Sequence, residues 1–377
     1  MVSSVTHHGR PFRADQVGSY LRPDKLVGAR QRAAKGEITR QELRAIEDQC
    51  IRELVALQEQ SGLHCVTDGE FRRGSWNKDF LAGFDNVVER PGNLKVFHRS
   101  PDGTPVAQVS AWGVTGKIKR SHQIQVEDFK FLKSVARVTP KTCMPSPTLL
   151  HFRGGREAID RTAYPDIDQF FADAAAAYRQ EIDELYAAGA RYIQLDDVNF
   201  AYLCDPRFRD AAQAMGEDPT RLVDTYIALV NNVIRNRPKD LLVAIHLCRG
   251  NLSTAGAAAG GYEVIGPSMF PGLDVDAYFL EYDDERAGGF EALKDVPNGK
   301  FVVLGLITTK RPELESKDDL KRRIDAAAKF VPLDRLCLSP QCGFASAISM
   351  HAKTKMEDEK AKLRLLVQTA TEVWGEA

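Results

Sequence analysis

The sequence predicts an α/β protein that folds as a (β/α)₈ TIM barrel. Short apolar runs alternate with longer amphipathic stretches along almost the whole chain, a pattern typical of repeated βα units that build a parallel sheet. Eight parallel strands with crossover helices close most economically into a barrel, although an open doubly wound sheet is the structural alternative. The expected strands, eight in number, are Gln16–Ser19, Cys65–Asp68, Ser134–Val138, Tyr192–Asp196, Leu241–Leu247, Ala277–Glu281, Phe301–Ile307 and Leu336–Ser339.

The amphipathic stretches between these runs carry apolar residues at helical spacing. No internal repeat, low-complexity tract or flexible linker interrupts the chain, so residues 1–377 are expected to form a single barrel domain. The expected helices are Thr39–Ser61, Ile167–Ala188, Pro219–Arg235, Lys317–Phe330 and Met356–Trp374.

The segment from Asp85 to Glu127 departs from this rhythm. Its apolar residues tend to alternate with period two, as in Pro105–Trp112, and show no helical pattern. We therefore expect residues 85–127 to be a β-meander inserted between the second and third barrel strands. Its role stays open between a substrate lid and a segment that only packs against the barrel or forms a homodimer interface.

Composition limits the classes of function. The chain has 377 residues, 43 % of them hydrophobic, and 51 basic residues against 52 acidic ones leave a net charge of −1, so nothing indicates a nucleic acid partner. Neither a secretory signal nor a membrane span is evident, which predicts a cytoplasmic protein. Seven cysteines are an odd number, which favours reduced thiols and metal ligands over a disulfide framework.

Metal-binding residues stand at the ends of three expected strands. The fifth strand ends in His246-Leu-Cys248, and residues two apart on a strand point the same way, so imidazole and thiolate can face one ion. Such a pair alone is more often part of the core, but Glu281 and Cys342 follow neighbouring strands. Two thiolates with an imidazole favour zinc over magnesium or calcium. The remaining cysteines, which we interpret as structural thiols, are Cys50, Cys65, Cys143, Cys204 and Cys337.

Carboxylates follow the second and fourth expected strands, at Glu70 and Asp196. Paired carboxylates in a partly dry pocket suit the capture of a substrate ammonium group. The alternative is a salt bridge to a neighbouring arginine, such as Arg72 or Arg73. Trp76, close in sequence to both arginines, could stack on a flat donor such as a pterin or simply pack in the core.

With these residues in order, the chain resembles the cobalamin-independent methionine synthases, specifically their C-terminal catalytic barrel and the short single-barrel homologues. The resemblance covers nearly the whole chain, and its specificity comes from six motifs in the family's order. The motifs are Val17-Gly-Ser19, Asp68-Gly-Glu70, Ile193-Gln-Leu-Asp196, His246-Leu-Cys248, Leu280-Glu281 and Pro340-Gln-Cys342-Gly.

The resemblance implies a zinc-dependent S-methyltransferase of methionine biosynthesis. It implies that a small-molecule thiol, homocysteine, receives a methyl group from 5-methyltetrahydrofolate or another methyl donor. By motif position, Ser19, Glu70 and Asp196 would hold the amino and carboxylate groups of homocysteine, with Glu70 and Asp196 as the candidate catalytic residues. The implied zinc ligands are His246, Cys248, Glu281 and Cys342.

The charge of this ligand set agrees with thiol alkylation. Two cysteinates and a glutamate give bound zinc a formal charge of −1, and −2 once a substrate thiolate joins. Such an electron-rich centre is a poor Lewis acid for hydrolysis but leaves a bound sulfur nucleophilic.

Two departures from the family leave the donor open. The full-length enzymes carry a second, N-terminal barrel that has no counterpart here, and their seventh strand ends in an Asp-Ile-His-Ser-Pro type motif. At that place this chain reads Gly305–Lys310, where Thr309 or Lys310 could contact an anionic substrate or merely be polar loop residues. The alternatives are a zinc alkyltransferase that adds coenzyme M to an epoxide or other alkyl donor, and a non-catalytic thiol- or metal-binding protein.

Overall fold

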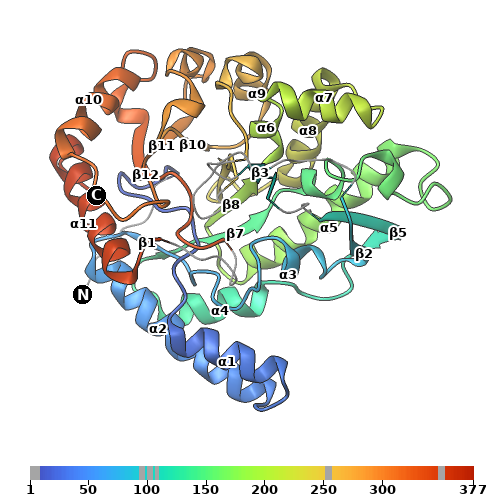
Figure 1. Ribbon diagram of the computed structural model, residues 1–377, viewed down its shortest axis with the longest axis horizontal. Coiled ribbons are helices and arrows are strands. Elements are labelled where there is room, and N and C mark those ends of the chain that lie inside the picture. The colour runs from blue at the N-terminus through green and yellow to red at the C-terminus, as the bar shows by residue number, and fades with distance from the viewer. Residues whose placement is uncertain (1–8, 93–97, 100–104, 107–109, 251–256, 347–352) are drawn as a thin grey trace.

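The computed structural model, which describes residues 9–92, 98–99, 105–106, 110–250, 257–346 and 353–377, has a parallel sheet of six strands at its centre (Figure 1). The strand order is β12-β11-β10-β9-β8-β7 and every neighbouring pair is parallel, which confirms the α/β class. The strands are β7 (Thr142–Pro145), β8 (Tyr192–Asp197), β9 (Leu242–Leu247), β10 (Ala277–Glu281), β11 (Phe301–Ile307) and β12 (Leu336–Pro340).

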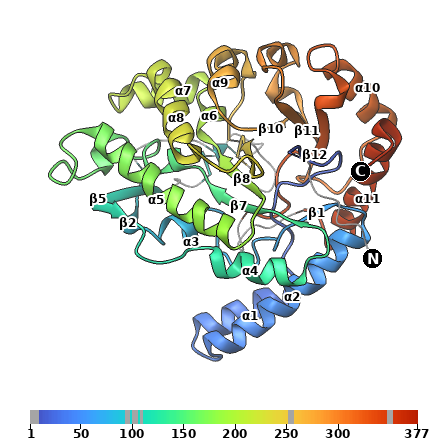
Figure 2. The same cartoon turned by 180° about the vertical axis from the view of Figure 1, so that it is seen from behind.

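Helices surround this sheet on its outer side (Figure 2). All five helices expected from sequence are present within a few residues of their predicted ends. The helices are α1 (Asp24–Ala34), α2 (Arg40–Gln60), α3 (Lys78–Leu81), α4 (Val126–Val135), α5 (Ile167–Ala187), α6 (Asn199–Tyr202), α7 (Pro206–Ala214), α8 (Pro219–Ile234), α9 (Gly266–Gly272), α10 (Lys317–Ala327) and α11 (Met356–Trp374).

Local capping fixes where the long helices begin. Thr39 and Glu42 form a reciprocal capping box at the start of α2, which satisfies backbone N–H groups that the first helical turn leaves free. Asp166 and Asp218 accept backbone N–H groups at the starts of α5 and α8. These short polar side chains explain why the sequence predicts the N-terminal helix boundaries well.

Five of the eight expected strands belong to the six-stranded sheet, as β8 to β12, but the third was misplaced. Ser134–Val138, expected to be that strand, begins in the last turn of α4, where Val126, Phe129 and Leu132 form a buried helical face. The third strand is instead β7, which contains a cysteine, a methionine and a proline rather than β-branched residues. Its position depends on parallel pairing with β8, which overrides the weak local preference.

The two N-terminal segments approach the sheet through few hydrogen bonds. β1 (Cys65–Val66) pairs in parallel with β6 (Thr139–Pro140). Residues 16–19, expected as the first strand, form no strand; isolated bridges join Ala14 to Leu338 and Ser19 to Gly69. Among the described residues the ladder is therefore a six-stranded sheet flanked by short pairings, which does not by itself confirm closure into a barrel.

The inner face of the sheet carries two of the candidate metal ligands, His246 and Glu281. A small apolar cluster on this face includes Ala244 of β9 and Phe279 of β10. Because side chains two apart on a strand share a face, His246 and Glu281 lie on the same side as this cluster, one step toward the C-terminal strand ends. The full cluster comprises Phe12, Val17, Cys65, Tyr192, Leu242, Ala244, Ala277, Phe279, Val303 and Cys337.

The insertion contains β structure, but its pairing differs from that of a meander. β2 (Asp85–Arg90) pairs antiparallel with β5 (Ala111–Lys119). Between them, β3 (His98–Arg99) pairs antiparallel with β4 (Pro105–Val106). The described pairs are thus nested rather than sequential, and the C-terminal end of the predicted segment already belongs to α4.

None of the helices in the described residues combines the length and apolar character needed to cross a membrane.

Candidate metal and substrate site

The four residues expected to bind a metal come together at the C-terminal ends of β9, β10 and β12. One potential ligand atom from each of them lies within 4.8 Å of every other. All four side chains are buried, so the cluster is not a chance gathering of surface groups. Its members are His246, Cys248, Glu281 and Cys342.

The sulfur atoms have the spacing of ligands on one ion. Cys248 Sγ and Cys342 Sγ are 3.6 Å apart, close to the roughly 3.8 Å that Zn–S bonds of about 2.3 Å subtend in a tetrahedron. Hydrogen bonding to Cys342 and burial raise the pKa of the Cys248 thiol well above its usual value. A cation here would reverse that shift by favouring the thiolate.

The His246 imidazole is neutral, and its nitrogens could coordinate a metal ion. Burial lowers the pKa of His246 to about 3, with the Lys141 ammonium acting in the same direction, so the ring is uncharged at neutral pH. Its two nitrogens have no well-formed hydrogen bond among the described residues, although the Phe279 backbone is close enough to favour the protonated ring slightly. An orphaned buried imidazole is costly unless a ligand satisfies it.

The Glu281 carboxyl has a hydrogen-bond partner on only one of its two oxygen atoms among the described residues. Its Oε1 accepts the backbone N–H of Arg249 at 2.9 Å, whereas its buried Oε2 has no partner among the described residues. Burial raises the pKa of this carboxyl, and the Lys310 ammonium opposes the rise. The unpartnered oxygen, the orphaned imidazole and the paired sulfurs together fit a soft divalent ion such as zinc.

The second group of residues, expected to hold an amino acid substrate, combines Asp196 near the end of β8 with Glu70 in the loop after β1. Asp196 and Glu70 are both buried, and they are close enough to act on each other electrostatically. Burial raises the pKa of Asp196 to about 8, and the charge of Glu70 adds to the shift. Gln194 Nε2 donates to Asp196 Oδ1 at 2.6 Å, which orients the carboxyl. Two adjacent buried carboxyls are a suitable receptor for a substrate ammonium.

Glu70 is held in an unusual backbone conformation. Its φ of 60° lies in the left-handed region, which residues with a Cβ seldom adopt. The Asp68 carboxylate accepts the Glu70 N–H at 2.9 Å, and Arg73 Nη1 lies 3.5 Å from Glu70 Oε1. The salt bridge to Arg73 that the sequence left open is therefore present, but Glu70 Oε2 remains without a partner among the described residues.

Ser19 lies where the two groups of residues meet. On one side Ser19 forms an isolated parallel β-bridge with Gly69. On the other side the Ser19 carbonyl accepts the backbone N–H of Phe344 at 2.9 Å, and Phe344 lies two residues after Cys342. A Cβ added to Gly343 would come within 1.9 Å of Ser19 Oγ, and Gly18 has a φ of +134°. Both glycines are therefore required for the close packing of these two loops.

Trp76 and the remaining cysteines stand apart from the metal cluster. The backbone N–H of Trp76 donates to the Ser346 carbonyl at 2.9 Å. The half-buried Trp76 ring packs against the main core. Cys143 Sγ donates to the Val17 carbonyl at 3.3 Å, close to the carboxyl groups of Glu70 and Asp196. The five cysteines interpreted as structural are free and buried, and they are not members of the cluster found among the described residues.

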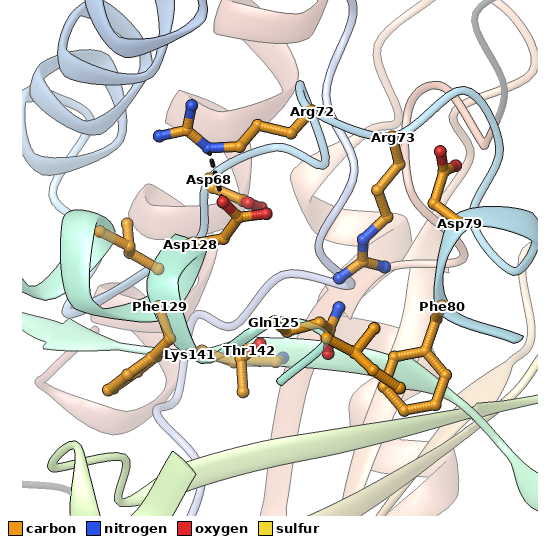
Figure 3. Close-up of a pocket in the computed structure, with 12 residues that line it drawn as sticks. Asp68, Arg72, Arg73, Asp79, Phe80, Gln125, Asp128, Phe129, Lys141 and Thr142 are labelled. Carbon is orange, nitrogen blue, oxygen red and sulfur yellow. Dashed lines mark ion pairs between the residues drawn. The ribbon is translucent and has the colours of Figure 1, made fainter. Parts of the chain in front are cut away.

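A pocket of about 500 Å³, counting space open to solvent, is lined by Arg72, Arg73 and Asp128 among others (Figure 3). Its acids are already engaged: Arg72 Nε is 3.2 Å from Asp128 Oδ1, the ion pair drawn in Figure 3. The metal-binding residues are not among the side chains that line it. The candidate metal cluster at the strand ends is therefore distinct from this pocket.

Sequence patterns left the roles of Arg73 and Lys310 open and missed Gln194 and Lys141. Arg73 lies three residues after Glu70 and pairs with it, whereas Lys310 pairs with the more distant Asp283 beside Glu281. Gln194 contacts Asp196 two residues along the same strand, a contact that the two-residue period of a strand could have indicated. Lys141 acts on His246 from a distant part of the chain, so no spacing marks it.

Comparisons with known proteins agree with this geometry. The family model described as the catalytic domain of cobalamin-independent synthase matches residues 12–371. YxjH, an uncharacterized protein of Bacillus subtilis, is 42 % identical over 367 residues, which cover 97 % of this chain and 95 % of YxjH.

A solved structure and a named enzyme extend the comparison. The crystal structure of a candidate vitamin-B12 independent methionine synthase from Listeria monocytogenes is 36 % identical with a TM-score of 0.77, and covers 97 % of this chain and 99 % of that one. A 5-methyltetrahydropteroyltriglutamate–homocysteine methyltransferase of Bacillus velezensis is 23 % identical over 94 % of this chain, which spans only 42 % of that enzyme. The chain therefore belongs to the family of cobalamin-independent synthase catalytic domains.

Proposed function

We propose that this protein is a zinc-dependent S-methyltransferase that transfers a methyl group to homocysteine and releases methionine. The observation that carries the proposal is the buried cluster of one imidazole, two thiols and one carboxyl whose ligand atoms lie within 4.8 Å of one another. The family and the printed activity of the Bacillus velezensis relative support it. Closure of the parallel sheet into a (β/α)₈ barrel belongs to the same proposal.

The residues that would hold zinc are His246, Cys248, Glu281 and Cys342. When bound, zinc would supply a thiolate at neutral pH by lowering the pKa of a coordinated substrate thiol. The protein's own contribution is to present three anionic ligands in a buried site. That excess of negative charge suits a nucleophilic sulfur better than an activated water.

The amino acid part of the substrate would lie on the neighbouring loops. Glu70 and Asp196 would bind the ammonium group, which provides the positive charge that these two buried carboxyls need. Gln194 and Arg73 keep the two carboxyls in place through contacts of 2.6 Å and 3.5 Å. Ser19, between Gly69 and the loop after Cys342, would contact the carboxylate end of the amino acid.

The methyl donor is 5-methyltetrahydrofolate or another carrier of an activated methyl group. Trp76 is the residue we propose for stacking on a flat donor, because its ring is only half-buried and its backbone N–H is bonded to Ser346, four residues after Cys342. A sulfonate thiol such as coenzyme M is disfavoured as acceptor, since two carboxyls would repel its anionic end.

The test combines a metal readout with product analysis. We expect about one zinc per chain in the purified protein, and homocysteine should replace a nitrogen or oxygen neighbour of zinc by sulfur in the X-ray absorption spectrum. A screen of methyl donors, read by mass spectrometry of the thiol product, should then yield methionine. A spectrum unchanged by saturating homocysteine, with coenzyme M or another thiol alkylated instead, would reject the proposed acceptor.

A further inference from the structure

Arg22 connects three segments of the chain at the C-terminal strand ends. It comes three residues after Ser19, and its guanidinium donates to carbonyl groups of two other loops. Nη1 donates to the Ala345 carbonyl at 2.9 Å, and Nη2 donates to the carbonyls of Glu70 at 2.9 Å and Arg73 at 3.2 Å. One side chain therefore ties the segment of Ser19 to the loop after β1 and to the loop after β12.

These two loops carry residues of both proposed ligand sets. The loop after β1 contains Glu70, proposed to bind the substrate ammonium, and the loop after β12 contains the candidate zinc ligand Cys342, three residues before Ala345. The ammonium and the sulfur belong to one substrate molecule, so their binding groups must keep a fixed separation. Arg22 contacts the backbone of both loops and is a member of neither ligand set.

Strand pairing alone joins these loops weakly. Between β12 and the loop after β1, the strand pairing of the described residues is limited to isolated bridges, from Ala14 to Leu338 and from Ser19 to Gly69. A continuous ladder would fix the relative position of two strand ends through many hydrogen bonds. Here side-chain contacts such as those of Arg22 have to contribute to that position.

The contacts of Arg22 also act on the backbone of Glu70. The φ of Glu70 is 60°, a conformation that a residue with a Cβ keeps only when its surroundings impose it. Asp68 Oδ1 accepts the Glu70 N–H at 2.9 Å. The Glu70 carbonyl accepts the Arg22 guanidinium at 2.9 Å and the Arg73 N–H at 3.0 Å. Loss of Arg22 would remove the charged donor, which forms the stronger kind of hydrogen bond, and would let this backbone relax.

We propose that Arg22 is a positioning residue that holds Glu70 at a fixed place relative to the loop after Cys342. One thiol amino acid can then reach the carboxyl groups and the metal ligands together. The inference rests on the proposed function and deepens it, because it names a residue that keeps the two ligand sets in one frame. Arg22 acts through the backbone of Glu70 and does not itself touch the substrate.

Methionine binding by the zinc-loaded protein measures this role, because methionine has the amino acid group of the proposed substrate and no thiol. Calorimetry compares wild type with Arg22→Met and Arg22→Lys. Arg22→Met should bind methionine at least about tenfold more weakly, as expected when a binding group is misplaced. Arg22→Lys keeps the charge but lacks the planar fork that reaches two loops, so it should stay at least about threefold weaker than wild type. Zinc content should remain about one per chain in both variants.

A double-mutant cycle with Glu70 separates positioning from a general loss of structure. Glu70→Gln keeps an oxygen acceptor but removes the charge that binds the ammonium. Because Arg22 acts through Glu70, Arg22→Met should weaken methionine binding by less than about threefold further in that background. A merely structural role of Arg22 would give the same loss with and without the Glu70 carboxylate.

Arg13→Met is the matched control. Arg13 Nη1 also joins two backbone carbonyls, those of Asp334 at 3.0 Å and Leu336 at 2.8 Å, but at the opposite end of β12. Its loss should lower the unfolding midpoint and leave methionine affinity within about threefold of wild type. Unfolding midpoints of all variants reveal a general loss of stability, and Arg22→Gln replaces Arg22→Met if the latter does not fold.

The inference is overturned if Arg22→Met, or Arg22→Gln in its place, binds methionine within about threefold of wild type. It is also overturned by an equal loss in Arg13→Met, by full recovery in Arg22→Lys, or by additive effects with Glu70→Gln. If the wild-type protein binds neither methionine nor homocysteine, the proposed function is rejected and the inference with it, so the two failures are distinguishable.

Discussion

Cys248 and Cys342 are separated by 94 positions in the chain, yet their sulfur atoms lie 3.6 Å apart in the interior. They belong to different strand ends, with β10 and β11 between β9 and β12 in the sheet order. Two thiols at this distance without a disulfide lie beside an imidazole and a carboxyl without full hydrogen bonding, and the four residues form a cluster that could hold a metal ion. Four predictions follow from this site and its surroundings.

Replacement of Cys342 by serine should abolish tight zinc binding. The hydroxyl is a far poorer ligand than a thiolate because it stays protonated at neutral pH. Zinc content after dialysis, measured by atomic emission, should fall from about one per chain to near zero. Cys337→Ser is the control, since Cys337 lies on β12, the strand that Cys342 follows, but in the inner apolar cluster. Retention of zinc by the Cys342 variant would contradict the assignment.

Substrate binding should release a proton from Asp196. Because burial and Glu70 raise its pKa to about 8, the free carboxyl is mostly protonated at pH 7, and a bound ammonium would favour the ionised form. Methionine serves as probe because it has no thiol proton. Calorimetry at pH 7 in buffers of different ionisation enthalpy should detect up to about one released proton.

Two comparisons check the origin of that proton. At pH 9.5 the carboxyl of Asp196 is already ionised, and much of the free methionine carries a neutral amine that must gain a proton to bind as the ammonium, so binding should take up protons instead of releasing them. Asp196→Asn should release fewer protons at pH 7 and bind more weakly. Equal release by wild type and the variant would place the proton elsewhere.

Gly343→Ala should impair substrate binding without removing the metal. The added methyl group would collide with Ser19 Oγ at 1.9 Å, so one of the two loops must move. We expect at least about a tenfold rise in KM for homocysteine, as for the loss of a well-oriented substrate contact, with zinc content unchanged. Gly28→Ala is the control, because a Cβ there meets nothing within 4 Å.

The pH dependence of stability should carry the signature of Glu359. Burial raises the pKa of this carboxyl from 4.5 to about 8, although its Oε2 accepts the Leu21 N–H at 2.8 Å. Between these pH values the unfolded chain loses a proton that the folded protein keeps. The free energy of unfolding attributable to Glu359 is therefore greatest below pH 4.5 and declines as the pH rises toward 8.

Urea denaturation at pH 5 and pH 8.5 measures this effect. Wild type should lose on the order of 3 kcal/mol more stability than Glu359→Gln over that interval. Glu357→Gln, on the same helix but 81 % exposed, is the control and should behave like wild type. Identical slopes for wild type and Glu359→Gln would show that Glu359 is ionised in the folded protein.

The sequence by itself determined the α/β class, the long helices and the candidate metal ligands. These rest on local physics: capping residues such as Thr39 and Asp166 fix helix starts, and the two-residue period of a strand puts Ala244 and His246 on one face. The order of the family motifs then predicted that His246 and Cys342 belong to one metal site.

Only the tertiary structure decided the features that depend on pairing between distant segments. Thr142–Pro145 became the third strand because β8 supplies its hydrogen bonds, and the insertion pairs its outer strands with each other. Lys310 meets Asp283, and Lys141 meets Asp15, through segments that the sheet brings together. A strand's partner and a buried charge's counter-ion are set by packing and burial, and neither leaves a periodic mark in the sequence.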